Sequence, residues 1–124
     1  MNQVFYHQTT PFTVPTTDGK RIDEHFGRVA TKTDALSIAR MVAPPGWTEP
    51  PQQPDFGEYT LMVSGRKRVE IDGSVVELSA GESLFVPSGA LVRYSNPYDE
   101  PAVYWSVCTP AFAPELAHRR DESA

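Results

Sequence analysis

The chain has 124 residues, of which 40% are apolar and 22% charged, and this size favours one domain with its own hydrophobic core. The net charge of −5, with no long basic run, excludes the positive surface that nucleic-acid binding requires. No apolar run could span a bilayer, and residues 1–10 lack the features of a signal peptide. The single cysteine excludes an internal disulfide and fits a reduced compartment. We therefore expect a cytoplasmic protein with neither nucleic-acid nor membrane partners.

Residues 1–35 carry the weakest secondary-structure signal and are expected to form an N-terminal arm. Aromatic and β-branched residues at 4–7 and 12–15 predict short edge strands. Residues 16–20 predict a turn, and the polar residues 21–34 predict a loop or one irregular helical turn.

From residue 36 onward, short apolar and β-branched segments alternate with turn sequences. The first segment ends at a Pro-Pro-Gly sequence, and Asp72-Gly73 predicts a two-residue hairpin turn because this dipeptide tolerates positive φ. About seven or eight strands are expected before residue 110, which is typical of an antiparallel sandwich or barrel. The basic cluster at 65–68 is expected in solvent at a hairpin tip. Residues 111–124 predict a tail with one helical turn, since Pro114 suits an early helix position.

Seven residues after residue 36 match the scaffold positions of two short motifs that occur together in one family. The first motif has a glycine, a glutamate and a second glycine, and the second has a glycine, a Pro-x-Gly and an asparagine. The matching residues are Gly46, Glu58, Gly65, Gly81, Pro87, Gly89 and Asn96. In this spacing the chain resembles the cupin superfamily over residues 36–110. The resemblance implies an all-β fold, a cupin-type double-stranded β-helix or jelly-roll barrel of the RmlC-like type, between an irregular arm and a C-terminal tail.

The metal-binding positions of the two motifs depart from the family pattern. Cupins hold a metal with three histidines and a glutamate, and only Glu58 matches that set here. The other positions carry Pro51 and Gln53 (or Gln52 and Pro54 in the other register) and Val92.

One carboxylate and neutral amides bind transition metals poorly, and the three histidines of the chain lie in the arm or the tail, where a surface position is expected. We therefore expect no metal ligand and no cofactor. A metal held by other ligands, or reached by a partner subunit, is the alternative.

The alternation of strand residues predicts which side chains point into the barrel. If Glu58 points inward, Thr60 and Met62 do so too, whereas Tyr59 faces outward. The same parity on the other strands predicts a ligand cavity with apolar walls and a few polar groups. The substrate-binding candidates are Met41, Gln52, Gln53, Thr60, Met62, Val92, Ser106 and Cys108, and the catalytic candidates are Glu58, Tyr94 and Tyr104.

The residues leave three functions open. A carboxyl group inside an apolar barrel is costly unless it is paired or protonated, so Glu58 is a candidate acid or base, with Tyr94 or Tyr104 as the partner acid. The protein would then be a metal-independent isomerase, epimerase, cyclase or lyase acting on a small polar organic molecule. The alternatives are a non-catalytic metabolite-binding module and a metal-dependent enzyme of the dioxygenase type with rearranged ligands. By resemblance, a homodimer is expected, which would also cover edge strands.

Overall fold

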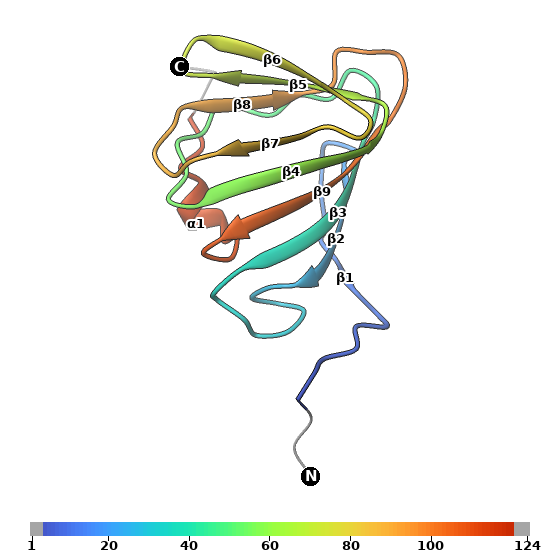
Figure 1. Cartoon of the computed structure of the whole chain (residues 1–124), viewed down its shortest axis with the longest axis vertical. Helices are drawn as coiled ribbons and strands as arrows, with labels where there is room; N and C mark the ends of the chain where they lie inside the picture. The colour runs from blue at the N-terminus through green and yellow to red at the C-terminus, as the bar shows by residue number, and fades with distance from the viewer. Residues whose placement is uncertain (1–3, 121–124) are drawn as a thin grey trace.

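The protein, as a computed structural model that describes residues 4–120, folds into two antiparallel sheets that face each other (Figure 1). One sheet has six strands in the order β1-β2-β3-β9-β4-β7, and the other has three in the order β6-β5-β8. This arrangement confirms the all-β, cupin-type fold class. The strands are β1 Phe12–Thr13, β2 Arg21–Phe26, β3 Ser37–Ala43, β4 Gly57–Ser64, β5 Arg66–Ile71, β6 Ser74–Ser79, β7 Ser83–Val86, β8 Val92–Ser95 and β9 Ala102–Thr109.

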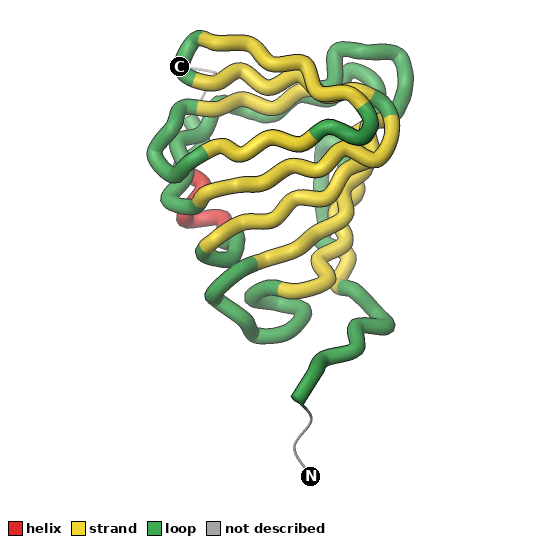
Figure 2. The backbone as a smooth tube through the Cα atoms, viewed as in Figure 1, coloured by secondary structure: helices red, strands yellow, loops and turns green. Residues whose placement is uncertain are grey.

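The N-terminal residues contribute more to the sheet than their sequence predicts. Strand β2 pairs with β3 along its length, so the prediction of a loop or helical turn for residues 21–34 is wrong at residues 21–26. The strand signal is weak because polar side chains of β2, such as that of Glu24, face the interior and obscure the alternation. The predicted edge strand at 12–15 appears as β1, whereas residues 4–7 form no strand (Figure 2). The Tyr6 ring lies 5.9 Å from that of Phe26 on β2.

The core fills the space between the two sheets. On β4 the buried residues Glu58, Thr60 and Met62 alternate with exposed ones, as the parity argument predicts. On β9, Tyr104 and Ser106 are likewise buried. The main apolar cluster comprises Ala43, Trp47, Met62, Val69, Leu78, Val86, Ala90, Val92, Tyr94, Ala102 and Tyr104. Trp47, from the loop before β4, belongs to this core.

The tail folds back over one end of the barrel. Helix α1 (Pro114–Ala117) begins with a proline in its first turn, as the sequence predicts. Ala117 and Phe112 pack against Phe56 and Cys108, so the tail contributes a second, smaller apolar cluster. In Figure 1 this helix lies beside the ends of β4 and β9. No helix among the described residues is long and apolar enough to cross a membrane.

The outer face of β4 stays exposed. Tyr59, Leu61 and Val63 keep about half of their surface in solvent, and the ring of Phe85 on β7 lies 4.6 Å from that of Tyr59. The homodimer and the division into an arm (1–35), a barrel (36–110) and a tail (111–124) remain predictions.

Candidate functional site

A cavity of about 80 Å³ lies inside the barrel, between the six-stranded sheet, β5 and β8. Such a volume is small against the range typical of drug-sized ligands, so the cavity suits a small molecule. Its walls come from seven strands or strand ends, the loop before β4 and the tail. The lining residues are Val14, Lys20, Ile22, Glu24, Ser37, Ala39, Met41, Glu49, Gln52, Phe56, Glu58, Lys67, Tyr94, Ser106, Cys108, Phe112 and Arg119.

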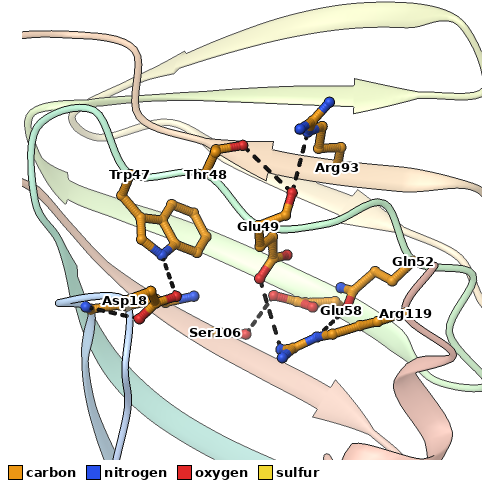
Figure 3. Close-up of polar contacts among 10 residues, drawn as sticks. Asp18, Trp47, Thr48, Glu49, Gln52, Glu58, Arg93, Ser106 and Arg119 are labelled. Carbon is orange, nitrogen blue, oxygen red and sulfur yellow. Dashed lines mark hydrogen bonds and ion pairs between the residues drawn. The ribbon is translucent and has the colours of Figure 1, made fainter. Parts of the chain in front are cut away.

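Glu58 lies on the cavity wall near the start of β4 and is 9% exposed. Ser106 on the neighbouring strand β9 donates a hydrogen bond of 2.7 Å to Oε2 of Glu58 (Figure 3). This is the one side-chain hydrogen bond to Glu58 among the described residues, and each carboxylate oxygen can accept two. The carboxyl group therefore keeps acceptor capacity for a molecule in the cavity.

Lys67 on β5 lies inside the barrel and is only 1% exposed. The expectation that the basic cluster at 65–68 is solvated is therefore wrong at this residue. Strand alternation gives the reason: Lys67 shares a face with Val69 and Ile71, while Arg66 and Arg68 flank it on the outer face. That apolar face was visible in the sequence and could have identified Lys67.

A second lysine, Lys20, directly precedes β2. Its side chain lines the cavity and is 9% exposed. Its Nζ lies 4.3 Å from the ring centroid of Trp47. Burial disfavours the charged form of Lys20, but Tyr104 and the Glu49 carboxylate outweigh this effect and raise the pKa of Lys20. The Trp47 indole is fixed by donating a 2.7 Å hydrogen bond to Asp18 (Figure 3).

The loop before β4 and the tail meet at the mouth of the cavity. Arg119 lies 3.9 Å from the Glu49 carboxylate, and its Nε donates to the side-chain oxygen of Gln52 at 3.5 Å (Figure 3). Gln52 is held through its backbone by Val92, at 2.9 and 2.8 Å. Burial raises the pKa of Glu49, although Lys20 and Arg119 oppose the shift. The mouth is thus closed by polar contacts between segments distant in sequence.

The structure brings together some of the predicted site residues and separates others. Of those candidates, the cavity is lined by Met41, Gln52, Glu58, Tyr94, Ser106 and Cys108. Between the two alternatives Gln52 and Gln53, only Gln52 is buried, and Gln53 instead donates to the carbonyl of Gly89 at an exposed position.

Met62, Val92 and Tyr104 do not line the cavity, because they pack into the apolar core. Thr60, also outside the cavity lining, is buried on the inner face of β4. The sequence reasoning did not find Lys20, Lys67, Glu49 or Arg119, which supply most of the charge at the cavity.

Tyr94 and Cys108 are both neutral at physiological pH. Burial raises the pKa of Tyr94 well above its ordinary value, and the charge of Glu58 adds to the effect. Burial likewise raises the pKa of the Cys108 thiol, with Glu58 as the next cause. Tyr94 can therefore donate a hydrogen bond, whereas Cys108 is a poor nucleophile because the thiolate is the reactive form.

The donors at the cavity do not suit the metal that cupins with the usual motifs hold. Within residues 4–120, no three His, Cys, Asp or Glu side chains form a group that could hold a metal ion. Gln52 and Val92 occupy positions where the family pattern has histidines. The charged ammonium group of the buried Lys20 also repels a cation. Neither His25, whose ring lies 5.0 Å from that of Trp105 at a tilt of 58°, nor His118, beside Asp55, lines the cavity.

Known proteins resemble this chain at the level of sequence family and of fold. The family described as Cupin domain matches residues 39–108. A protein of Myxococcus xanthus (strain DK1622) named Endoribonuclease YbeY is 49% identical over 105 residues, which is 85% of this chain and 36% of that protein. This chain thus spans little more than a third of that relative's length.

Three solved structures share the fold. Oxalate decarboxylase from Bacillus subtilis has a TM-score of 0.77 at 17% identity, over 92% of this chain and 31% of that one. An RmlC-like cupin from Shewanella frigidimarina NCIMB 400 has a TM-score of 0.71 at 18% identity, over 92% and 95% of the two chains. KdgF from Halomonas sp. has a TM-score of 0.69 at 16% identity, over 94% and 98%. At these identities the likeness concerns the fold alone, but together with the family match it shows that the chain belongs to the cupin domain family.

Proposed function

We propose that this cupin barrel is a metal-independent enzyme that binds a small polar organic molecule and moves a proton on it with Glu58. The reaction class is that of an isomerase, epimerase, cyclase or lyase. The observation that carries the proposal is the buried Glu58 carboxyl group, which faces a cavity lined by two lysines and accepts a hydrogen bond from Ser106. Ionisable groups in a concave, desolvated site are enriched for catalytic roles.

The polar groups of the cavity provide the other parts that such a reaction needs. Glu58 exchanges the proton, and the neutral Tyr94 hydroxyl is the partner acid. Tyr104, the other candidate acid, has its pKa raised to about 12 by burial and lies behind the cavity wall. Lys20 and Arg119 offer positive charge to an oxygen of the bound molecule, while Met41 and Phe56 supply apolar wall.

Replacing Glu58 by glutamine tests the catalytic role directly. Small hydroxy acids and keto acids are incubated with the protein in deuterium oxide, and exchange of their C–H protons is followed by NMR. We expect Glu58→Gln to lower the exchange rate about 10²–10⁴-fold, because the amide cannot accept the proton, while calorimetry still detects binding. Glu115→Gln, at an exposed glutamate of α1, is the matched control and keeps the wild-type rate.

Two outcomes would favour the alternatives. Binding without any exchange by the wild-type protein would identify a non-catalytic metabolite-binding module. A stoichiometric first-row metal that survives dialysis, found by elemental analysis, would favour the metal-dependent enzyme.

Endoribonuclease activity, named for the Myxococcus xanthus relative, is a weaker candidate. The relative's name describes a protein of which this chain spans 36%. The net charge of −5 disfavours binding to a polyanion. Incubation with structured and single-stranded RNA tests this activity, and specific cleavage that Glu58→Gln leaves intact would assign it to a different site.

A further inference from the structure

The chain has three lysines, and the barrel encloses two of them. Lysine is almost never fully buried without a partner, because removing an ammonium group from water is costly. Lys67 is 1% exposed, yet within residues 4–120 it forms neither an ion pair nor a side-chain hydrogen bond. The role of Glu58 proposed above does not explain why an unpaired amine is kept in the cavity.

Two tyrosine rings enclose the Lys67 amine. Its Nζ lies 3.7 Å from the ring centroid of Tyr104 and 4.1 Å from that of Tyr94. Ring faces attract an ammonium group, but at 1% exposure Lys67 loses most of the water that would stabilise its charge, and no carboxylate among the described residues forms an ion pair with it. A neutral amine is compatible with these surroundings.

The second lysine strengthens the preference for the neutral amine. Nζ of Lys20 lies 5.7 Å from the centroid of the same Tyr104 ring, so both lysines approach one aromatic side chain. Burial, followed by the positive charge of Lys20, lowers the pKa of Lys67 to about 7, although Glu58, Glu49 and Cys108 oppose the shift. Desolvation and a neighbouring cation are the two known means of activating a lysine as a nucleophile.

The pairing leaves Lys20 charged and about half of the Lys67 side chains as free amine at neutral pH. A free lysine with a pKa near 10.4 is almost entirely protonated there, so Lys67 carries on the order of a thousandfold more free amine than an exposed lysine. Lys20, whose pKa is raised, stays charged and can hold a carboxylate. The cavity therefore offers a nucleophile beside a fixed cation.

We propose that Lys67 is a nucleophilic amine that forms an imine with a small aldehyde or ketone in the barrel. This inference rests on the proposed function, since it assigns a substrate class to the same cavity. The Nζ lone pair forms a bond to the carbonyl carbon, and one of the two amine protons passes to the carbonyl oxygen to give a neutral carbinolamine. The C–O bond then breaks, and the oxygen leaves as water with a further proton from an acid in the cavity. The protonated imine that remains withdraws electrons from the adjacent carbon, whose proton Glu58 removes.

The acid for the dehydration step is available in the cavity. Glu49 lines it, and burial favours its protonated form. The imine nitrogen retains one proton, so the net change is one amine, one carbonyl and one proton converted to one protonated imine and one water. No oxidant or reductant is needed.

Reductive trapping tests the proposal on the 124-residue chain. The protein is incubated at neutral pH with pyruvate, a small keto acid, or with propanal, which has no carboxylate, and is then treated with sodium borohydride. Borohydride reduces the imine to a stable secondary amine, which peptide mapping by mass spectrometry assigns to one of the three lysines. We expect a single adduct on Lys67 with at least one probe, abolished in Lys67→Arg and unchanged in Lys32→Arg, the matched control at an exposed lysine.

A further variant separates an activated lysine from one that is merely accessible. Lys20→Met removes the neighbouring charge, so we expect the pH at which trapping is half-maximal to move upward while the adduct stays on Lys67. Circular dichroism confirms that each variant is folded. No adduct with either probe, or adducts spread over all three lysines, would overturn the proposal.

The two proposals can fail separately. Trapping on Lys67 combined with undiminished proton exchange in Glu58→Gln would retain the imine and remove Glu58 from its role. Loss of exchange in Glu58→Gln without trapping would retain the proposed function and remove the imine.

Discussion

At the scale of the residue, the chemistry of this barrel depends on charged side chains that strand alternation turns inward. Lys67 lies between two arginines in the sequence, and such a basic cluster is typical of a hairpin tip exposed to solvent. In the structure it lies on the same face of β5 as the core residue Val69. Glu58 was recognisable in advance because it occupies a motif position, whereas Lys67 could be found only by applying parity to a strand that was expected to be exposed.

The buried amine of Lys67 predicts how stability depends on pH. Its pKa is about 7 in the folded protein and about 10.4 in the unfolded chain. Between these values the unfolded state binds more protons, so the free energy of unfolding rises with pH. Each pKa unit corresponds to about 1.4 kcal/mol, and the rise should reach a few kcal/mol.

Urea denaturation at several pH values between about 7 and 10 measures this effect. We expect the rise to be absent in Lys67→Met, which keeps an apolar stem of similar length. Lys32→Met, at an exposed position, should retain the wild-type slope. Parallel profiles for the wild-type protein and Lys67→Met would show that the amine titrates normally in the fold.

At the scale of the element, glycine turns set where one strand ends and the next begins. The turn at Gly65 links β4 in the large sheet to β5 in the small sheet, and its φ is +74°. A Cβ at this position would lie 2.2 Å from the carbonyl oxygen of Pro101. Gly73, in the β5–β6 hairpin turn, has a similar φ of +89°, but a Cβ there would meet nothing within 4 Å.

This pair of glycines separates backbone strain from steric clash. Gly73→Ala should lower the free energy of unfolding by about 1–2 kcal/mol, the cost of a left-handed conformation with a Cβ. Gly65→Ala should cost clearly more, because the backbone at Pro101 must also move. Chemical denaturation of both variants measures the difference, and equal costs would mean that the turn at Gly65 adapts without strain.

At the scale of the whole molecule, a buried asparagine links β8 to the loop after β3. Asn96 follows β8 and is 0% exposed. Its side-chain amide donates to the carbonyls of Ala43 and Pro44, both at 3.2 Å, and of Glu100 at 2.9 Å. These bonds cross from the small sheet to the end of a strand in the large sheet, so the motif asparagine fixes how the two sheets meet.

Removing this link should destabilise the whole barrel. We expect Asn96→Ala to lower the free energy of unfolding by roughly 2–3 kcal/mol, because the buried carbonyl of Ala43 and the partly buried carbonyls of Pro44 and Glu100 lose their donor. Ser95→Ala changes the adjacent, partly exposed residue, and should cost less than about 0.5 kcal/mol. Thermal and urea unfolding compare the two variants, and a small cost for Asn96→Ala would mean that water replaces the amide.

The sequence by itself determined the architecture of the barrel. Its turns and its strand alternation follow from local backbone preferences, which do not depend on distant parts of the chain. The seven motif positions were identified by their resemblance to the cupin pattern. With Glu58 taken as inward from its motif position, strand alternation predicted that Thr60, Met62, Ser106 and Cys108 also point inward, and these residues are buried.

Only the tertiary structure decided which charges share the cavity. Lys20, Glu49, Lys67 and Arg119 come from four separate segments, and of these only Lys67 could be inferred from the sequence, by strand alternation. Strand β2 was missed for a related reason, since its polar residue Glu24 faces the cavity and its hydrogen bonds go to β3. The electrostatic character of the site arises from burial and from distances between segments, and these exist only once the two sheets and the tail have closed around it.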